Sequence, residues 1–149
     1  MGVASRLRFQ GSQAGRRVLL VDGDPTSRAS LCAGLRADGH QVVEVVGPTQ
    51  LLFALQVAAD ALGPSPQVVI ADLAMSGVHD VLLAHQEALA GGYLIALAPS
   101  QLPKELDALD PLAVFLRPFD DGDLRTIVMN AALLHRARAA RRPALTRSR

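Results

Sequence analysis

Aromatic residues and cysteine are scarce in this chain. Its 149 residues include four Phe, one Tyr, no Trp and a single Cys. Because Cys32 has no second cysteine to pair with, an intrachain disulfide is excluded, which fits a reducing compartment. Half of the residues are hydrophobic. The core must therefore be built from Val, Leu, Ile and Ala, and the length suits one domain.

Long apolar segments are also missing. The longest strongly apolar run, LLFALQVAADAL, contains Gln56 and Asp60 and is too short to span a bilayer. At the N-terminus, Arg6 and Arg8 are not followed by an apolar stretch, so we expect no signal peptide. These two absences predict a cytoplasmic protein with no membrane span.

Charged residues are unevenly distributed, although the net charge is only +1. Residues 18–135 contain all 14 acidic residues but only five basic ones, which leaves this segment at −9. The other ten basic residues are arginines near the two ends. We predict a disordered basic tail at 1–16, a folded domain at 17–135, and a helix extension with a basic tail at 136–149.

The body alternates between short apolar runs and helical patterns. Five runs predict strands, at RVLLVD (17–22), QVVEVV (41–46), QVVIAD (67–72), YLIALA (93–98) and AVFLRP (113–118). Helices are expected at 25–38, 49–62, 80–89, 103–109 and from 120 past 135. Continuous apolar strands indicate a parallel sheet covered on both faces. The predicted fold class is α/β, a five-stranded parallel sheet in a doubly wound, flavodoxin-like (βα)5 sandwich.

Two of the predicted strands end on an acidic residue. VLLVDGDP delivers Asp22 and VVIADLAMSG delivers Asp72. In open α/β sheets, ligands bind at the carboxyl ends of the strands, where both acids are expected. They therefore predict a shared site. The simpler alternative is two carboxylates solvated at a sheet edge.

The motifs VLLVDGDP, VVIADLAMSG and FLRPFD, in this order, resemble the receiver domain of bacterial response regulators. The resemblance covers about residues 17–135. It implies that Asp72 accepts a phosphoryl group from a phosphohistidine of a sensor kinase, and that Asp22 and Asp72 hold Mg²⁺, with Asp24 a further candidate ligand. Arg117 stands where the family has a Lys that binds the phosphoryl oxygens. A carboxylate nucleophile needs such cations, because its attack on phosphorus brings two anions together.

Several site positions depart from the family pattern. Gly23 replaces the second metal-binding acid, and Asp24 comes one residue too late to substitute for it. Ala98 replaces the usual Ser or Thr, Ser100 is too far along to serve instead, and Val114 replaces an aromatic switch residue. Arg117 keeps the charge of the usual Lys but is larger and forked. An alternative role for Arg117 is an ion pair with Asp72 that carries no chemistry.

These departures predict an atypical single-domain receiver that acts as a protein-binding signalling module. Phosphorylation of Asp72 that depends on Mg²⁺ would be weak or absent, because a metal ligand and the phosphate-binding hydroxyl are missing. The alternative is a functional phosphoacceptor in a two-component phosphorelay, with slow self-dephosphorylation as its only activity. In neither case is the chain an enzyme in the usual sense. The expected partner is a sensor histidine kinase or a downstream effector, and a homodimer is left open.

Other function classes find less support. A nucleotide binder would need a glycine-rich loop after the first strand, but GDPTSR contains one Gly. The arginine tails could contact nucleic acid, yet no aromatic residues interleave with them, which disfavours that partner. The four histidines His40, His79, His85 and His135 are expected at the surface, with His79 as an alternative residue at the rim of the acid site.

Overall fold

A parallel β-sheet forms the centre of the computed structural model, which describes residues 15–59, 66–86, 92–99, 106–131, 133 and 134. Its five strands pair in the order β2-β1-β3-β4-β5. All pairings are parallel. This confirms the predicted five-stranded parallel sheet. The strands are β1 (Arg17–Val21), β2 (Gln41–Val45), β3 (Val68–Asp72), β4 (Tyr93–Ala98) and β5 (Ala113–Leu116).

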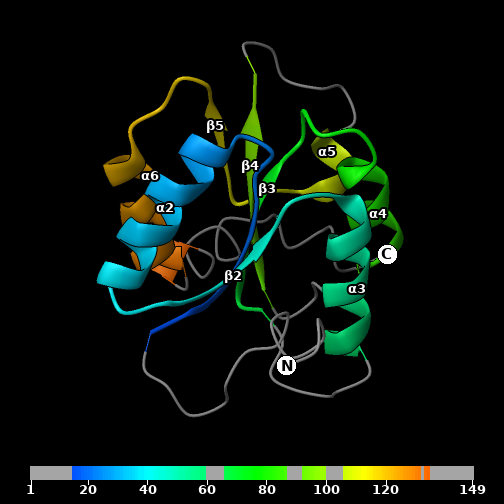
Figure 1. Cartoon of the computed structure of the whole chain (residues 1–149), viewed down its shortest axis with the longest axis horizontal. Helices are drawn as coiled ribbons and strands as arrows, with labels where there is room; N and C mark the ends of the chain where they lie inside the picture. Colours follow the sequence, from blue (N-terminus) through cyan, green and yellow to red (C-terminus); the bar gives the residue numbers. More distant parts are fainter. Residues whose placement is uncertain (1–14, 60–65, 87–91, 100–105, 132, 135–149) are drawn as a thin grey trace, which may run out of the picture.

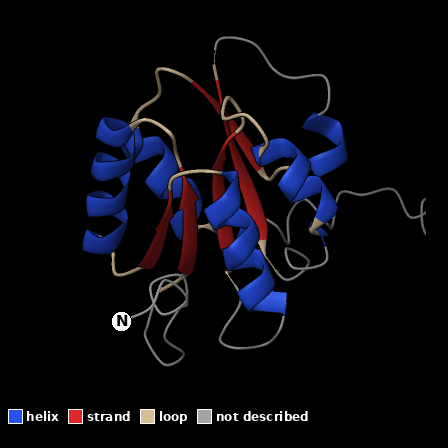
Figure 2. Ribbon diagram, turned by 45° about the vertical axis from the view of Figure 1, so that its right-hand side comes forward, coloured by secondary structure: helices blue, strands red, loops and turns tan. Residues whose placement is uncertain are grey.

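Helices cover both faces of the sheet, as a doubly wound fold requires (Figures 1 and 2). Helices α2 and α6 pack on one face, and α3, α4 and α5 pack on the other. Their bounds are α2 (Pro25–Ala37), α3 (Pro48–Ala59), α4 (Val78–Ala84), α5 (Leu106–Leu109) and α6 (Asp121–Met129). No helix among these described segments has the length and apolar character needed to cross a bilayer.

Two helices differ from their predicted ranges. Helix α4 spans Val78–Ala84, so it begins two residues before the predicted range of 80–89 and ends five residues before its limit. Gly77, with a left-handed φ of 87°, is its N-cap. Helix α6 ends at Met129, well before the predicted limit, and residues 131, 133 and 134 are helical again. The side chain of Asn130 donates to the carbonyl of Thr126 at 2.9 Å, a local bond that accompanies the interruption. Residues 1–14 of the predicted N-terminal tail and the extension past residue 135 lie outside the described residues, whereas Arg16, at the end of that predicted tail, is hydrogen-bonded to α6.

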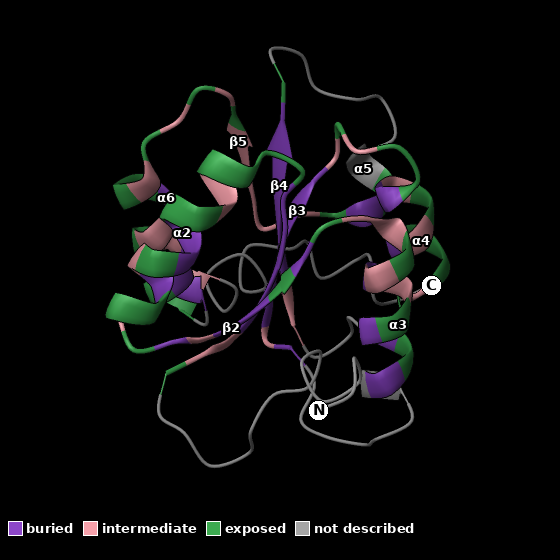
Figure 3. Ribbon diagram, viewed as in Figure 1, coloured by how far each residue is buried: buried purple, intermediate pink, exposed green. Residues whose placement is uncertain are grey.

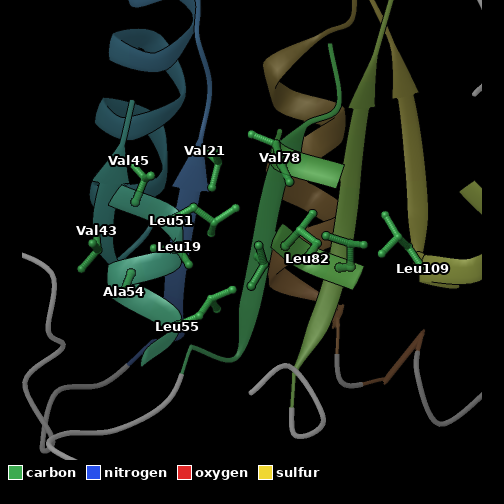
Figure 4. Close-up of a cluster of buried hydrophobic side chains, with 13 residues drawn as sticks. Leu19, Val21, Val43, Val45, Leu51, Ala54, Leu55, Val78, Leu82 and Leu109 are labelled. Carbon is green, nitrogen blue, oxygen red and sulfur yellow. The ribbon is translucent and has the colours of Figure 1, made fainter. Parts of the chain in front are cut away.

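The core consists of two aliphatic layers, one on each face of the sheet. Along β1, Leu19 and Val21 face the α3–α4 side, whereas Val18 and Leu20 face the α2–α6 side. Every residue of β3 is buried, which explains its continuous apolar sequence (Figure 3). Figure 4 shows the layer on the α3–α4 side, built from Val, Leu and Ala. No aromatic residue belongs to the fully buried core of the described chain, which confirms the predicted aliphatic core.

Strand β5 has little cover, unlike β2, which is the other edge strand of the sheet. Three of its residues are only half-buried, and Leu116 is 42% exposed. The neighbouring helix α5 has four residues, so it can shield only a small part of the strand. The prediction of a strand buried on both faces is therefore wrong for β5, and this edge leaves apolar surface accessible.

His40 lies directly before β2, at the opposite end of the sheet from Asp22 and Asp72. With Arg16 it links this turn to the end of α6. It is 7% exposed, so its predicted surface position is wrong. Its Nδ1 accepts a hydrogen bond of 3.0 Å from the backbone N–H of Arg16. The Arg16 side chain reaches the carbonyl oxygens of Val128 and Met129 at the end of α6. His79 and His85 are half-buried, and His135 lies outside the described residues.

The buried imidazole should make stability depend on pH. Burial lowers the pKa of His40 below its ordinary value of 6.5, and nearby Arg16 lowers it further, while Asp38 opposes both effects. Protonation would also turn Nδ1 into a donor facing the N–H of Arg16. The stabilising effect of the neutral ring is complete above about pH 6.5 and is lost as the pH falls through the folded-state pKa.

We therefore expect the free energy of unfolding in urea to fall as the pH drops below about 6.5, and to fall less in a His40→Gln variant. The Gln side chain can still accept from the Arg16 N–H but cannot be protonated. His79→Gln serves as the matched control and should retain the wild-type pH dependence. Equal pH dependence in the His40→Gln protein and the wild type would contradict this account.

Candidate functional site

The carboxyl ends of β1 and β3 bring Asp22 and Asp72 together, as the sequence predicted. Strands β1 and β3 are hydrogen-bonded neighbours, with Val21 opposite Ala71 directly before the two acids. Asp22 is fully buried and Asp72 is 6% exposed. The simpler expectation of two solvated carboxylates is therefore wrong. Buried carboxylates are costly unless a cation and hydrogen bonds stabilise them.

The cation at this site is Arg117, which follows the edge strand β5. Its Nη2 lies 2.8 Å from Oδ1 of Asp22 and 3.6 Å from Oδ2 of Asp72. The nearer partner is thus Asp22, and not Asp72 as in the ion-pair alternative drawn from the sequence. Nη1 donates to the hydroxyl of Ser27 at 3.1 Å. The guanidinium also lies over the ring of Phe119, 5.5 Å from its centroid.

Backbone amides hold the two carboxylates from the loops that follow each strand. The N–H of Asp24 donates to Oδ1 of Asp22 at 3.0 Å, and the N–H of Ala74 donates to Oδ1 of Asp72 at 3.0 Å. A longer bond of 3.4 Å joins the N–H of Gly23 to Oδ2 of Asp72. Oδ2 of Asp22 is buried and has no hydrogen-bond partner within the described chain. The two acids are therefore held rigidly, with one oxygen of Asp22 left unsatisfied.

Asp24 serves as the N-cap of α2. Its Oδ1 accepts from the backbone N–H groups of Thr26 and Ser27, at 3.0 and 3.5 Å. The residue is exposed, whereas Asp22 is fully buried. Its position in the sequence, directly before Pro25, is the usual signal for a helix start. This capping role gives a structural reason for Asp24 that does not involve a metal.

Three positions depart from the family pattern. Gly23 directly follows Asp22, Ala98 ends β4, and Val114 lies on β5. A Cβ atom added to Gly23 would lie 3.1 Å from Cγ of Met75, so the Met75 side chain occupies the space into which a second acid would extend. Ala98 is fully buried at the end of β4 and offers no hydroxyl. Val114 is half-buried on β5. Ser100 lies outside the described residues.

The donor set at this edge does not fit Mg²⁺ well. The ion takes six oxygen ligands in near-octahedral geometry and is usually bound through one or two carboxylates. Here Oδ1 of Asp22 already binds Arg117, and Gly23 supplies no carboxylate. No group of three or more His, Cys, Asp or Glu side chains among the described residues is arranged to hold a metal. A guanidinium therefore occupies the place where a divalent cation would be needed to balance the acids.

Sequence reasoning missed three contributors to this site. Ser27 positions Arg117, Phe119 stacks on it, and Met75 fills the space beside Gly23. Phe119 was within the FLRPFD motif, and Met75 was within the loop after Asp72. Their roles depend on side-chain directions, which spacing alone does not reveal. Ser27 is in the first turn of α2, where Ser has a common structural role and so gives no functional signal.

Removing the guanidinium should destabilise the fold. An Arg117→Gln variant would leave two buried carboxylates without a counter-charge, so we expect the free energy of unfolding in urea to fall by about 2 kcal/mol, less than for a fully buried pair because Arg117 is partly exposed. Adding Asp22→Asn should restore part of the loss.

The matched control is Arg36→Gln. Arg36 is more exposed, lies 3.8 Å from Glu44 and donates to the carbonyl of Val42, so its loss should cost about 1 kcal/mol or less. Equal effects of the two single substitutions would show that Arg117 does not neutralise the buried acids.

Comparisons with known proteins agree on the fold. No protein-family model matches the chain, and no curated protein matches its sequence. A response regulator receiver domain protein from Clostridium thermocellum is similar in structure, with a TM-score of 0.62, 21% identity, and coverage of 84% of this chain and 98% of that one. The receiver domain of a Francisella response regulator gives a TM-score of 0.65 at 16% identity, covering 83% and 99% of the two chains.

A chemotaxis response regulator of Vibrio cholerae gives a TM-score of 0.60 at 20% identity, covering 76% of this chain and 97% of that one. Such low identities carry information about the fold and not about the chemistry of the site. The chain therefore has the fold of response regulator receiver domains.

Proposed function

We propose that this chain is an atypical receiver module of signal transduction, which binds a protein partner while phosphorylation of Asp72 that depends on Mg²⁺ is weak or absent. The observation that carries the proposal is the position of Arg117, 2.8 Å from Asp22 and 3.6 Å from Asp72. The counter-charge that a metal supplies to such acids is already part of the polypeptide. The partner would be a sensor histidine kinase or a downstream effector.

The electrostatic balance of the site opposes metal binding. A divalent ion at Asp22 would either displace the guanidinium or lie beside it, and like charges at this distance repel by several kcal/mol in a partly screened site. The third carboxylate that could offset this repulsion is missing at Gly23. Filling that position would require Met75 to move, because its Cγ lies 3.1 Å from where the new Cβ would be.

The positions that would transmit phosphorylation are also changed. Ala98 has no hydroxyl to bind a phosphoryl oxygen, and Val114 has no aromatic ring to reorient. A switch needs an element with two arrangements that the modification biases. With neither group available, a fixed binding surface explains the site better than one that responds to phosphorylation.

One feature favours the competing candidate, a working phosphoacceptor. Among the described residues, Oδ2 of Asp72 is held by the 3.4 Å bond from Gly23 and the 3.6 Å contact with Arg117 alone. This oxygen could attack phosphorus and form an acyl phosphate as the bond between phosphorus and the donor's leaving group breaks. Arg117 would then stabilise the new phosphoryl oxygens.

A phosphorylation assay with acetyl phosphate distinguishes the proposed binding module from a working phosphoacceptor. With millimolar Mg²⁺, intact mass spectrometry should show little phosphorylated wild-type protein. A Gly23→Asp/Ala98→Thr/Arg117→Lys variant should gain phosphorylation that depends on Mg²⁺, because it regains the acid, the hydroxyl and the smaller cation.

Asp72→Asn in both backgrounds is the control that assigns any added phosphate to Asp72. Rapid phosphorylation of the wild type that requires Mg²⁺ would overturn the proposed function. A restored variant that shows no gain would mean that the three substitutions are not what limits the reaction.

A further inference from the structure

The chain just before β1 crosses the turn that leads into β2, at the end of the sheet remote from Asp22. Gly15 adopts a left-handed φ of 82°, and a Cβ atom added there would collide with the carbonyl oxygen of Gly39. Glycine is therefore required for this close approach. The N–H of Gln41 donates to the carbonyl of Arg16 at 3.0 Å, which extends the β1–β2 pairing by one residue. Residues 15 and 16 are thus packed against the folded domain.

His40 and Arg16 fasten this crossing to α6. Nδ1 of His40 accepts a hydrogen bond of 3.0 Å from the backbone N–H of Arg16. The Arg16 side chain donates from Nε to the carbonyl of Val128 at 3.0 Å, and from Nη2 to that of Met129 at 3.4 Å. A guanidinium is stabilising there, because the last carbonyls of a helix carry partial negative charge. Together, Gly15, Arg16 and His40 form what we call the latch.

The closed latch requires a neutral imidazole. An Nδ1 atom that accepts a hydrogen bond carries no proton, so the single proton of the neutral ring is on Nε2. Nε2 is buried and has no hydrogen-bond partner within the described part of the chain. An unpaired buried donor weakens the closed arrangement. A second proton, on Nδ1, would face the N–H of Arg16 donor to donor, so a charged ring is incompatible with the closed latch.

The surroundings of the ring also oppose its protonation. Burial is the main effect and lowers the pKa of His40 below its ordinary value of 6.5, while Asp38 at the C-cap of α2 raises this pKa and Arg16 lowers it. Both oxygens of Asp38 are already bound by Arg125 of α6, at 2.8 and 2.7 Å. These hydrogen bonds hold the pKa of Asp38 below its ordinary value of 3.8. That carboxylate therefore stays charged near neutral pH, and His40 is the group that titrates.

We propose that the latch opens when His40 binds a proton, which releases the chain before β1 from the end of α6 while the sheet stays folded. The closed form is fully favoured above about pH 6.5, and this advantage is lost as the pH falls through the folded-state pKa. Opening would free the segment that contains Arg6 and Arg8. The latch lies at the opposite end of the sheet from Asp22 and Asp72, so it operates independently of the function proposed above.

The test is amide hydrogen exchange of the ¹⁵N-labelled full chain, followed by NMR from about pH 7.5 to 5 and corrected for the exchange rate of an unstructured peptide. The protection of the Arg16 amide should fall by up to about tenfold for each pH unit below 6.5, because opening takes up one proton. Low urea should leave this exchange unchanged, since a local opening exposes little surface. The amide of Ile70, in the middle of β3, should exchange more slowly and should accelerate with urea.

The imidazole and three variants test the cause of the opening. A long-range ¹H–¹⁵N spectrum should show the neutral His40 ring protonated on Nε2. In His40→Gln, the Arg16 amide should keep its protection at every pH, because Gln can accept the bond but cannot be protonated. His79→Gln is the matched control and should keep the wild-type response. Arg16→Gln should leave the His40 titration in place but abolish the shifts of the Met129 and Asn130 amides that accompany it in the wild type.

Three results on the wild type would each overturn the latch. They are a neutral ring protonated on Nδ1, protection of the Arg16 amide that does not change with pH, and exchange of that amide that accelerates with urea as steeply as that of Ile70. The last result would mean that Arg16 is released only when the whole chain unfolds. None of these measurements involves Asp72, so they leave the phosphorylation result standing.

Discussion

The ion pair between Arg117 and Asp22 is the interaction on which the site depends. Parallel strands β1 and β3 end side by side, so their terminal acids are forced together where little water can reach them. Two buried carboxylates require a cation, and the chain supplies one from the loop after β5. Ser27 and Phe119 then hold this guanidinium on the α2 side of the site, closer to Asp22 than to Asp72.

This arrangement connects the acid site to the surface around it. Arg117 is both the counter-ion of the buried acids and part of the wall of a neighbouring pocket. Asp24 at the N-cap of α2 and Asp121 in the first turn of α6 also line that pocket. The described residues thus place a pocket next to a pair of buried acids that a guanidinium neutralises. The function proposed above, binding of a protein partner, requires neither a metal nor a phosphoryl group.

Much of the fold could be predicted from the sequence, because the strands are continuous apolar runs and the helices begin at clear caps such as Asp24-Pro25. The meeting of Asp22 and Asp72 followed from parallel topology. Burial of His40 was not predicted, since a His beside a Gly at a turn usually faces solvent. The half-exposed β5 was missed because its apolar sequence resembles that of a central strand. The preference of Arg117 for Asp22 depends on Ser27 and Phe119, which a linear motif does not place around a guanidinium.

The most direct test of the central claim is an NMR titration of the ¹⁵N-labelled wild-type chain with Mg²⁺, followed by beryllofluoride, which mimics a phosphoryl group on Asp72. If Arg117 already neutralises the acids, millimolar Mg²⁺ will leave the amides of Gly23, Ala74 and Arg117 unshifted, and beryllofluoride will not bind in a way that depends on the metal. Saturable shifts of these amides that require Mg²⁺ would contradict the account and identify the site as a working phosphorylation switch.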